Sequence, residues 1–140
     1  MSDTRWKVYK FGGSSLADAS CFERVARILS ERTEPRIGVV VSAMAGMTDD
    51  LFRLRARDDE QSDDLQRIGT RYSQVSSQLV AGDDLTRLLA EWDTDAAAIT
   101  ALLQTAEQGG ASGQRNRDII AGYGEIWSAR LLAAHLAQRL

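Results

Sequence analysis

A lysine, two glycines and two serines stand close together near the start of the chain, in the segment KFGGSS over residues 10–15. Glycines lack a Cβ, so their backbone N–H groups can approach an anion closely, and the serine hydroxyls add further donors. The ammonium group of Lys10 can neutralise β- and γ-phosphate oxygens, where charge shifts during phosphoryl transfer. The pattern therefore predicts a phosphate-binding loop, although it matches neither GxxxxGK[ST] nor GxGxxG. A simple turn with Lys10 as a surface charge is the alternative that the isolated segment leaves open.

Hydrophobic periodicity predicts the elements that hold this loop. Residues 6–11 alternate in polarity and run into the glycines, which indicates a strand that ends in a tight turn. Asp18 is a suitable N-cap for an amphipathic helix over residues 19–32. Residues 37–42 (IGVVVS) are typical of a strand buried on both faces of a parallel sheet. Residues 1–47 thus predict a βαβ unit with the loop at the carboxyl end of the first strand, where open α/β sheets bind ligands.

Residues 48–140 are predicted to be helical. Their spacing indicates, in chain order, a helix from about residue 50, an acidic turn over 58–64, helices over about 65–79 and 85–103, a flexible glycine-rich break over 109–113, and a final helix over about 115–139. The final helix is apolar on more than one face, so we expect it to lie between two layers. The fold class is therefore α/β with parallel strands and a helix-rich C-terminal half. Because a two-stranded parallel sheet needs covering, we expect a longer protein or self-association into a homo-oligomer.

Composition excludes several classes of function. Seventeen basic and twenty acidic residues give a net charge of −3, which provides no broad cationic surface for nucleic acid or anionic lipid. The single cysteine, Cys21, excludes an intramolecular disulfide and a cysteine zinc site, and it fits a reducing compartment. The polar N-terminus has no apolar signal region, and no apolar run reaches the roughly 20 residues that a membrane span needs. These features predict a soluble cytoplasmic protein without a membrane partner.

Three segments together resemble the aspartate kinases of the amino-acid kinase family. KFGGSSLAD over residues 10–18 is similar to the family's opening K-F-G-G-[ST]-S motif, and VVVSAMAGMTD over residues 39–49 is similar to its V-S-A motif. GYGEIWSARLL over residues 122–132 is similar to its G-E-x-x-S-A-x-L helix. The combination most resembles the kinase half of bifunctional aspartokinase–homoserine dehydrogenases. The resemblance implies that residues 1–140 are the N-terminal part of a catalytic domain with a three-layer α/β/α fold.

The resemblance also implies a reaction and its residues. The family transfers a phosphoryl group from ATP, with Mg²⁺ on the phosphates, to the β-carboxylate of L-aspartate, which is the first step toward the aspartate-derived amino acids. Residues matching the ATP-phosphate site are Lys10, which is also the catalytic candidate, Gly12, Gly13 and Ser14. Residues matching the L-aspartate site are Ser42, Thr48 and Glu125, with Glu125 facing the substrate's α-ammonium group. We assign no residue of this sequence as a metal ligand.

Each substrate residue has a structural alternative. Ser42 could merely end a strand, Thr48 could be the N-cap of the next helix, and Glu125 could pair with Arg130 or Arg117. A buried Glu125 carboxylate would need a cation, and the substrate ammonium is one. The family's later glycine-rich Ser-Asp motif is absent from the sequence, so we expect this piece to be inactive alone. An isolated phosphate-binding module or a self-associating piece without catalysis is the alternative.

Overall fold

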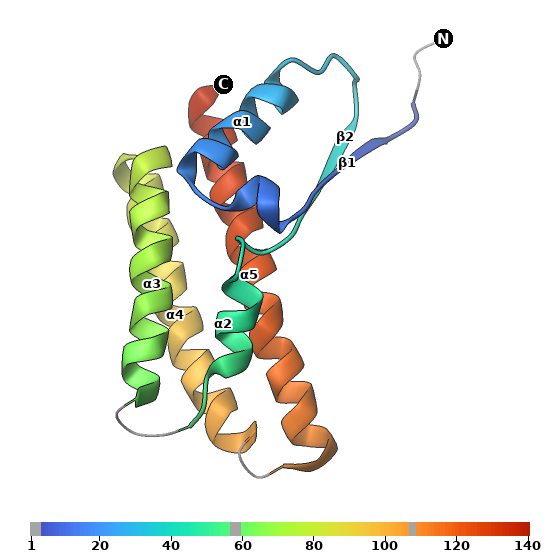
Figure 1. The fold of residues 1–140 in the computed structure, drawn as a ribbon. Coiled ribbons are helices and arrows are strands. Elements are labelled where there is room, and N and C mark those ends of the chain that lie inside the picture. Colours follow the sequence, from blue (N-terminus) through green and yellow to red (C-terminus); the bar gives the residue numbers. More distant parts are fainter. Residues whose placement is uncertain (1–3, 57–59, 107–108) are drawn as a thin grey trace.

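The computed structural model describes residues 4–56, 60–106 and 109–140. In chain order its elements are strand β1 (Lys7–Phe11), the 3-10 helix η1 (Gly13–Leu16), helix α1 (Ala19–Ser30), strand β2 (Ile37–Val41), and helices α2 (Met47–Arg53), α3 (Glu60–Leu79), α4 (Gly82–Ala106) and α5 (Gly110–Arg139). Figure 1 shows α3, α4 and α5 as long helices running side by side, with the small sheet and α1 at one end. The predicted α/β class with a helix-rich second half is confirmed.

The two strands pair in parallel, as predicted, with Lys10 opposite Val40 and Phe11 opposite Val41. One face of the sheet, which includes Phe11 and Val41, packs against the hydrophobic core. On the other face Val8 is 64% exposed and Val40 is 50% exposed. The prediction that the second strand is buried on both faces is therefore wrong for the described part of the chain. Apolar side chains of β2 point to both faces of the sheet, but the described helices pack on only one of these faces.

Helix α1 connects the two strands and packs against α3 and α5. The Asp18 carboxylate accepts a hydrogen bond from the backbone N–H of Cys21 at 2.9 Å, which confirms the predicted N-cap. Bonds from the Ser20 hydroxyl and from that N–H hold the pKa of the Asp18 carboxyl below its ordinary value. The buried residues of the helix recur at helical spacing and are Phe22, Val25, Ala26 and Leu29.

Helix α5 is the central packing element. It lies against α4, α2, α1 and β2, which confirms the prediction that it is enclosed by other layers. Trp127 in its middle is 1% exposed, and its ring centroid lies within 6.1 Å of the rings of Tyr72, Trp92 and Tyr123. This aromatic cluster joins α3, α4 and α5 into one core.

Two predicted turns are largely helical where the structure describes them. Of the predicted acidic turn, residues 58 and 59 lie outside the described part, while residues 60–64 form the first turn of α3. The predicted break at 109–113 is right only at Gly109, which has a φ of 75° and precedes the helix, because α5 already begins at Gly110. A Cβ added to Gly113 would lie 2.8 Å from the carbonyl oxygen of Ala106. This glycine therefore permits close packing of α5 against the end of α4 rather than flexibility.

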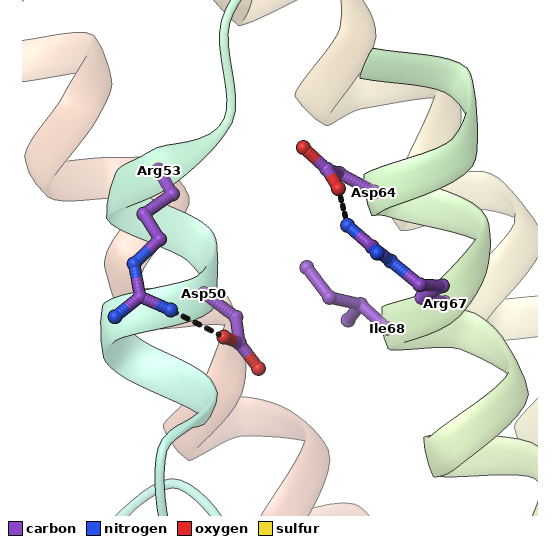
Figure 2. Close-up of a pocket in the computed structure, with 5 residues that line it drawn as sticks. All are labelled: Asp50, Arg53, Asp64, Arg67 and Ile68. Atoms are coloured by element: carbon purple, nitrogen blue, oxygen red, sulfur yellow. Dashed lines mark hydrogen bonds and ion pairs between the residues drawn. The ribbon is translucent and has the colours of Figure 1, made fainter. Parts of the chain in front are cut away.

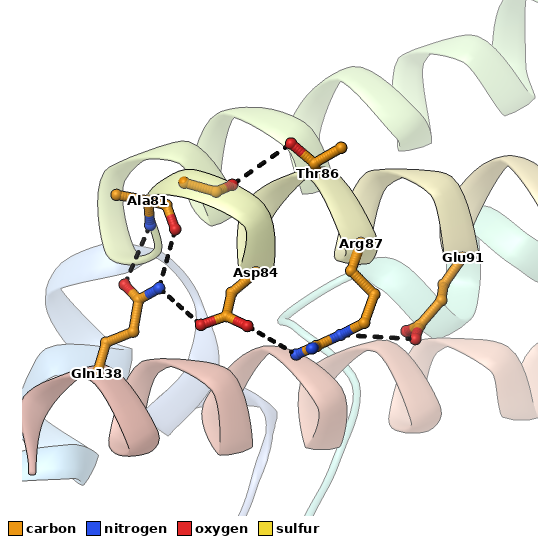
Figure 3. Close-up of polar contacts among 7 residues, drawn as sticks. Ala81, Asp84, Thr86, Arg87, Glu91 and Gln138 are labelled. Carbon is orange, nitrogen blue, oxygen red and sulfur yellow. Dashed lines mark hydrogen bonds and ion pairs between the residues drawn. The ribbon is translucent and has the colours of Figure 1, made fainter.

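The last turn of α5 is bonded to the connection between α3 and α4 (Figure 3). The Gln138 amide accepts from the backbone N–H of Ala81 at 3.1 Å and donates to its carbonyl oxygen at 2.9 Å. The same amide nitrogen donates to Asp84, whose other oxygen pairs with Arg87. These contacts fix the register of α5 along α3 and α4, and thereby the position of its middle relative to the sheet.

Candidate functional site

The three segments singled out in the sequence meet at Ala43, in the loop after β2. A Cβ added to Gly13 would lie 3.3 Å from the Ala43 carbonyl oxygen, and a Cβ added to Gly124 would lie 2.8 Å from the Ala43 Cβ. Ala43 itself is 4% exposed. The glycine loop and the G-E helix therefore each contact the V-S-A segment, at the same residue. Sequence reasoning did not single out Ala43, although a small residue between two glycine-containing segments was a usable signal for close packing.

The two glycines of the loop are not required by the backbone conformation. Neither Gly12 nor Gly13 adopts a positive φ, so no left-handed turn requires them. Gly13 is needed for the close approach to Ala43, whereas a Cβ at Gly12 would meet nothing within 4 Å among the described residues. The loop is closed by a hydrogen bond from the Ser15 N–H to the Gly12 carbonyl oxygen at 3.1 Å. Gly12 thus leaves a backbone surface open for another group to approach, which favours the phosphate-loop interpretation over a simple turn.

Lys10 lies on the uncovered face of the sheet. Its side chain is exposed, and it forms no ion pair with any residue that the structure describes. The N–H of Ser42 donates to the Phe11 carbonyl oxygen at 3.0 Å, which continues the ladder past the end of β2. Since alternate residues of a strand share a face, Lys10, Val40 and Ser42 lie on the same side. The strand register therefore places the Lys10 ammonium and the Ser42 hydroxyl on the same face of the sheet, near the ends of the two strands.

Thr48 is not a helix cap. The N-cap of α2 is Gly46, with a φ of 79°, and Thr48 is the second residue of the helix. The N-cap alternative for Thr48 is therefore wrong. The hydroxyls of Ser14, Ser42 and Thr48 form no side-chain hydrogen bond with the described part of the chain, and the last two residues are half-buried. These hydroxyls have donor capacity that a ligand could use.

Glu125 is exposed, so the expectation of a buried carboxylate is wrong. Neither alternative pairing forms, because Glu125 has no ion pair within the described residues. Arg130 instead bonds Asp95 at 2.7 Å and approaches Glu91 at 3.6 Å. Glu125 nevertheless follows Gly124, whose contact with Ala43 brings this turn of α5 to the loop after β2. Its assignment to the substrate stays a prediction.

A cavity of about 420 Å³ opens between α2 and α3, apart from these residues (Figure 2). Its lining residues are Asp50, Arg53, Asp64, Arg67 and Ile68. Each guanidinium pairs with a carboxylate one turn away on its own helix, Arg53 with Asp50 at 3.2 Å and Arg67 with Asp64. The charges already neutralise one another, and none of the predicted site residues lines the space. We assign no ligand to this cavity.

No group of three or more His, Cys, Asp or Glu side chains is arranged to hold a metal ion among residues 4–56, 60–106 and 109–140. In the same part of the chain, no helix combines the length and the apolar character needed to cross a bilayer.

A family model described as the amino acid kinase family matches residues 5–139. The chain belongs to this family. Its fold is similar to that of Escherichia coli aspartokinase III in complex with lysine and aspartate in the T-state, with a TM-score of 0.80 and 28% identity. The structure of the same enzyme with aspartate and ADP in the R-state gives a TM-score of 0.72. Both matches cover 94% of this chain and 29% of the enzyme chain.

Curated relatives agree with the family and with the predicted resemblance. The chain is 32% identical to bifunctional aspartokinase/homoserine dehydrogenase 1, chloroplastic, of Zea mays over 91% of this chain and 14% of the relative. It is 33% identical to bifunctional aspartokinase/homoserine dehydrogenase 2 of Escherichia coli over 95% of this chain and 16% of the relative. The chain thus spans about a sixth or less of these relatives, within their kinase part.

Proposed function

We propose that this chain is the N-terminal part of the catalytic domain of an aspartate kinase, with residues 1–47 as the phosphate-loop unit and 48–140 as the helical region. The reaction is the ATP-dependent phosphorylation of the L-aspartate β-carboxylate to 4-phospho-L-aspartate. The observation that carries the proposal is the meeting of three separate family segments at Ala43. A chance resemblance of short segments has no reason to bring them into contact.

The phosphate side of the proposed site is formed by Lys10, Gly12, Gly13 and Ser14. Gly12 leaves its backbone open, and the Ser14 hydroxyl has no partner within the described chain. Lys10 has an ammonium group that no described carboxylate neutralises. We infer that this ammonium lies on the transferring phosphoryl group, where it offsets the charge that accumulates during transfer.

The substrate side consists of Ser42, Thr48 and Glu125. Two hydroxyls are available to position the amino acid, and the Glu125 carboxylate is available for its ammonium group. The attacking β-carboxylate has an ordinary pKa of about 3.9, so it is already ionised at neutral pH and needs no general base. One of its oxygens forms a bond to the γ-phosphorus while the bond to the β-phosphate oxygen breaks and ADP leaves. The protein must therefore position two anions and offset their repulsion.

Magnesium fits this arrangement as an ion carried by the nucleotide. The described residues have no cluster of carboxylates, histidines or cysteines for a metal ion. Mg²⁺ is commonly held by substrate phosphates, waters and few protein ligands, so the donor set around the glycine loop is compatible with it. The ion would supply further neutralisation of the phosphate oxygens.

We further propose that the chain by itself does not turn over, that it acts in the cytoplasm, and that it self-associates. The catalytic candidate Lys10 stands on a face that no described helix covers, so water is not excluded from it. Val8 and Val40 are exposed on that same face, and both strands are edges. Such a surface favours association with another copy.

Calorimetric titration with Mg·ATP tests the phosphate site. The unaltered chain should release or absorb heat on binding, and Lys10→Ala should weaken binding by at least about tenfold through loss of a charge-assisted contact. Lys7→Ala is the matched control, because Lys7 is an exposed lysine on the same strand with its side chain on the opposite face. Absence of heat at millimolar nucleotide, or equal weakening by both substitutions, would contradict the proposal.

Two further measurements test the remaining parts. A coupled assay for aspartyl phosphate should show no product from this chain alone. Light scattering should show species larger than the monomer as concentration rises, and Val40→Lys should reduce them by placing a charge on the uncovered face. A monomer at every concentration would remove the expectation of self-association without affecting the proposed nucleotide site.

A further inference from the structure

Arg71, in the middle of α3, bonds both loops of the proposed site at once. Its Nη1 donates to the carbonyl oxygen of Ala45 at 2.8 Å, and its Nη2 donates to the carbonyl oxygen of Ala17 at 3.0 Å. Ala17 directly follows η1, which carries Gly13 and Ser14. Ala45 lies between Ser42 and Thr48. The half-buried side chain of Arg71 thus connects the proposed phosphate-binding loop with the loop of the proposed amino-acid site.

The guanidinium group is suited to this connection. It is planar, remains charged, and presents donors in a fixed fork, so two carbonyl oxygens held at a set separation can be bonded together. Bonds from a charged donor are stronger than bonds between neutral groups. The loops also touch directly, because a Cβ added to Gly13 would lie 3.7 Å from the Ala45 Cα. Movement of one loop relative to the other therefore stretches at least one of the Arg71 bonds.

We propose that Arg71 is a positioning residue that fixes the separation between the two loops. We call the two bonds from Arg71 to the loops the clamp, and its existence rests on their geometry alone. Its effect on catalysis rests on the proposed function, because an ångström of misplacement between phosphate and carboxylate reduces the rate strongly. The bonds of Arg71 are to the backbone carbonyls of Ala17 and Ala45, so it acts through these two loops.

The sequence contained a signal for this residue. Arg71 stands three residues after Ile68 and four before Val75, at the border of the apolar face of α3. An arginine in that position on a helix either extends its head to water or finds acceptors nearby. The structure shows the second outcome, with acceptors 54 and 26 residues away along the chain.

Hydrogen exchange of backbone amides tests the clamp without any ligand. The Ser15 N–H bonds the Gly12 carbonyl in the first loop, and the Met47 N–H bonds the Met44 carbonyl in the second. In Arg71→Gln both amides should exchange about tenfold faster, because local opening of either loop no longer breaks a charged bond. The amide of Leu131, in the core of α5, should be unchanged.

Two variants make this test specific. Arg67→Gln removes an arginine one turn earlier on the same helix, whose ion pair is with Asp64 in that helix, and should leave both loops unaffected. Arg71→Lys keeps the charge without the fork, so it should restore protection to at most one of the two amides. Equal acceleration at Leu131, acceleration in one loop alone, or full rescue by lysine would each overturn the proposal.

A binding measurement connects the clamp to function. If the unaltered chain binds Mg·ATP, Arg71→Gln should weaken that binding about tenfold and Arg67→Gln should not. Unchanged affinity in Arg71→Gln would overturn the consequence for the site. If the unaltered chain shows no binding, the proposed nucleotide function fails for this chain, while the exchange result still decides whether the clamp exists.

Discussion

Gly124 of α5 lies directly against Ala43 in the loop after β2, so closely that a Cβ added to Gly124 would lie 2.8 Å from the Ala43 Cβ. That separation is shorter than any ordinary contact between two carbon atoms. The same added atom would lie 3.2 Å from Met47 and 3.4 Å from Leu51 on α2. The absence of one side chain therefore sets how closely α5 approaches the loop and helix that carry Ser42 and Thr48.

Gly124→Ala should destabilise the chain by about 1–3 kcal/mol, because the new methyl group overpacks a buried contact and forces α5 away from the loop. Urea unfolding followed by circular dichroism measures the change. Gly122→Ala is the control, since a Cβ there would meet no atom of the described residues within 4 Å. That control should gain up to about 1 kcal/mol from better helix propensity. Similar losses in both variants would show that the contact with Ala43 is not the cause, and combining Gly124→Ala with Ala43→Gly should recover part of the loss.

Gly69 and Trp92 form a second close contact, between α3 and α4. A Cβ added to Gly69 would lie 2.4 Å from the far edge of the Trp92 indole ring, which also packs against Trp127. Gly69→Ala should cost about 1–2 kcal/mol, because the ring must shift out of the aromatic cluster. Unfolding by urea and a change in indole fluorescence measure this effect. In a Trp92→Leu background the same substitution should be nearly neutral, and an undiminished cost there would contradict the explanation.

Asp95 is 8% exposed and accepts two hydrogen bonds, from Trp127 Nε1 at 2.9 Å and from Arg130 Nη1 at 2.7 Å. Asp95→Ala should destabilise by about 2–4 kcal/mol, since it leaves the buried indole N–H without its acceptor and removes the shorter of the two ion pairs of Arg130. Asp95→Asn keeps an acceptor and should cost less. Asp93→Ala, at an exposed position on the same helix, should change stability by less than about 0.5 kcal/mol. Equal effects at positions 93 and 95 would show that the buried bonds are not needed.

Burial raises the pKa of Tyr72 from 10.0 to about 12. The folded state thus keeps the proton over a pH range in which the unfolded chain releases it. This contribution to stability is fully present below the ordinary pKa of 10.0 and is lost as pH rises through about 12. The free energy of unfolding should therefore fall by up to about 1.4 kcal/mol per pH unit in that window. Tyr72→Phe should remove this part of the alkaline loss, and identical pH profiles for the two proteins in urea unfolding would refute the prediction.

Local sequence was sufficient for the elements whose signals are local. The alternation before Gly12, the N-cap at Asp18 and the apolar spacing of α1 all predicted what the structure contains. Local signals failed where a residue has a non-local purpose. The glycines at 110 and 113 indicated a break, yet Gly113 faces the Ala106 carbonyl across a helix junction, and a junction is not encoded in the composition of one segment. The β-branched run of β2 indicated two-sided burial, which depends on what packs against each face.

For the site, sequence alone determined the inventory of groups: an ammonium at residue 10, two adjacent glycines, three hydroxyls and a carboxylate at residue 125, in the order of a known family. Tertiary structure decided which of them come together. The contact of Gly124 with Ala43 and the two bonds of Arg71 join segments far apart along the chain. Residue type sets which bonds a side chain can form, but only the packing of α3 and α5 against the sheet sets which partners lie within reach of them.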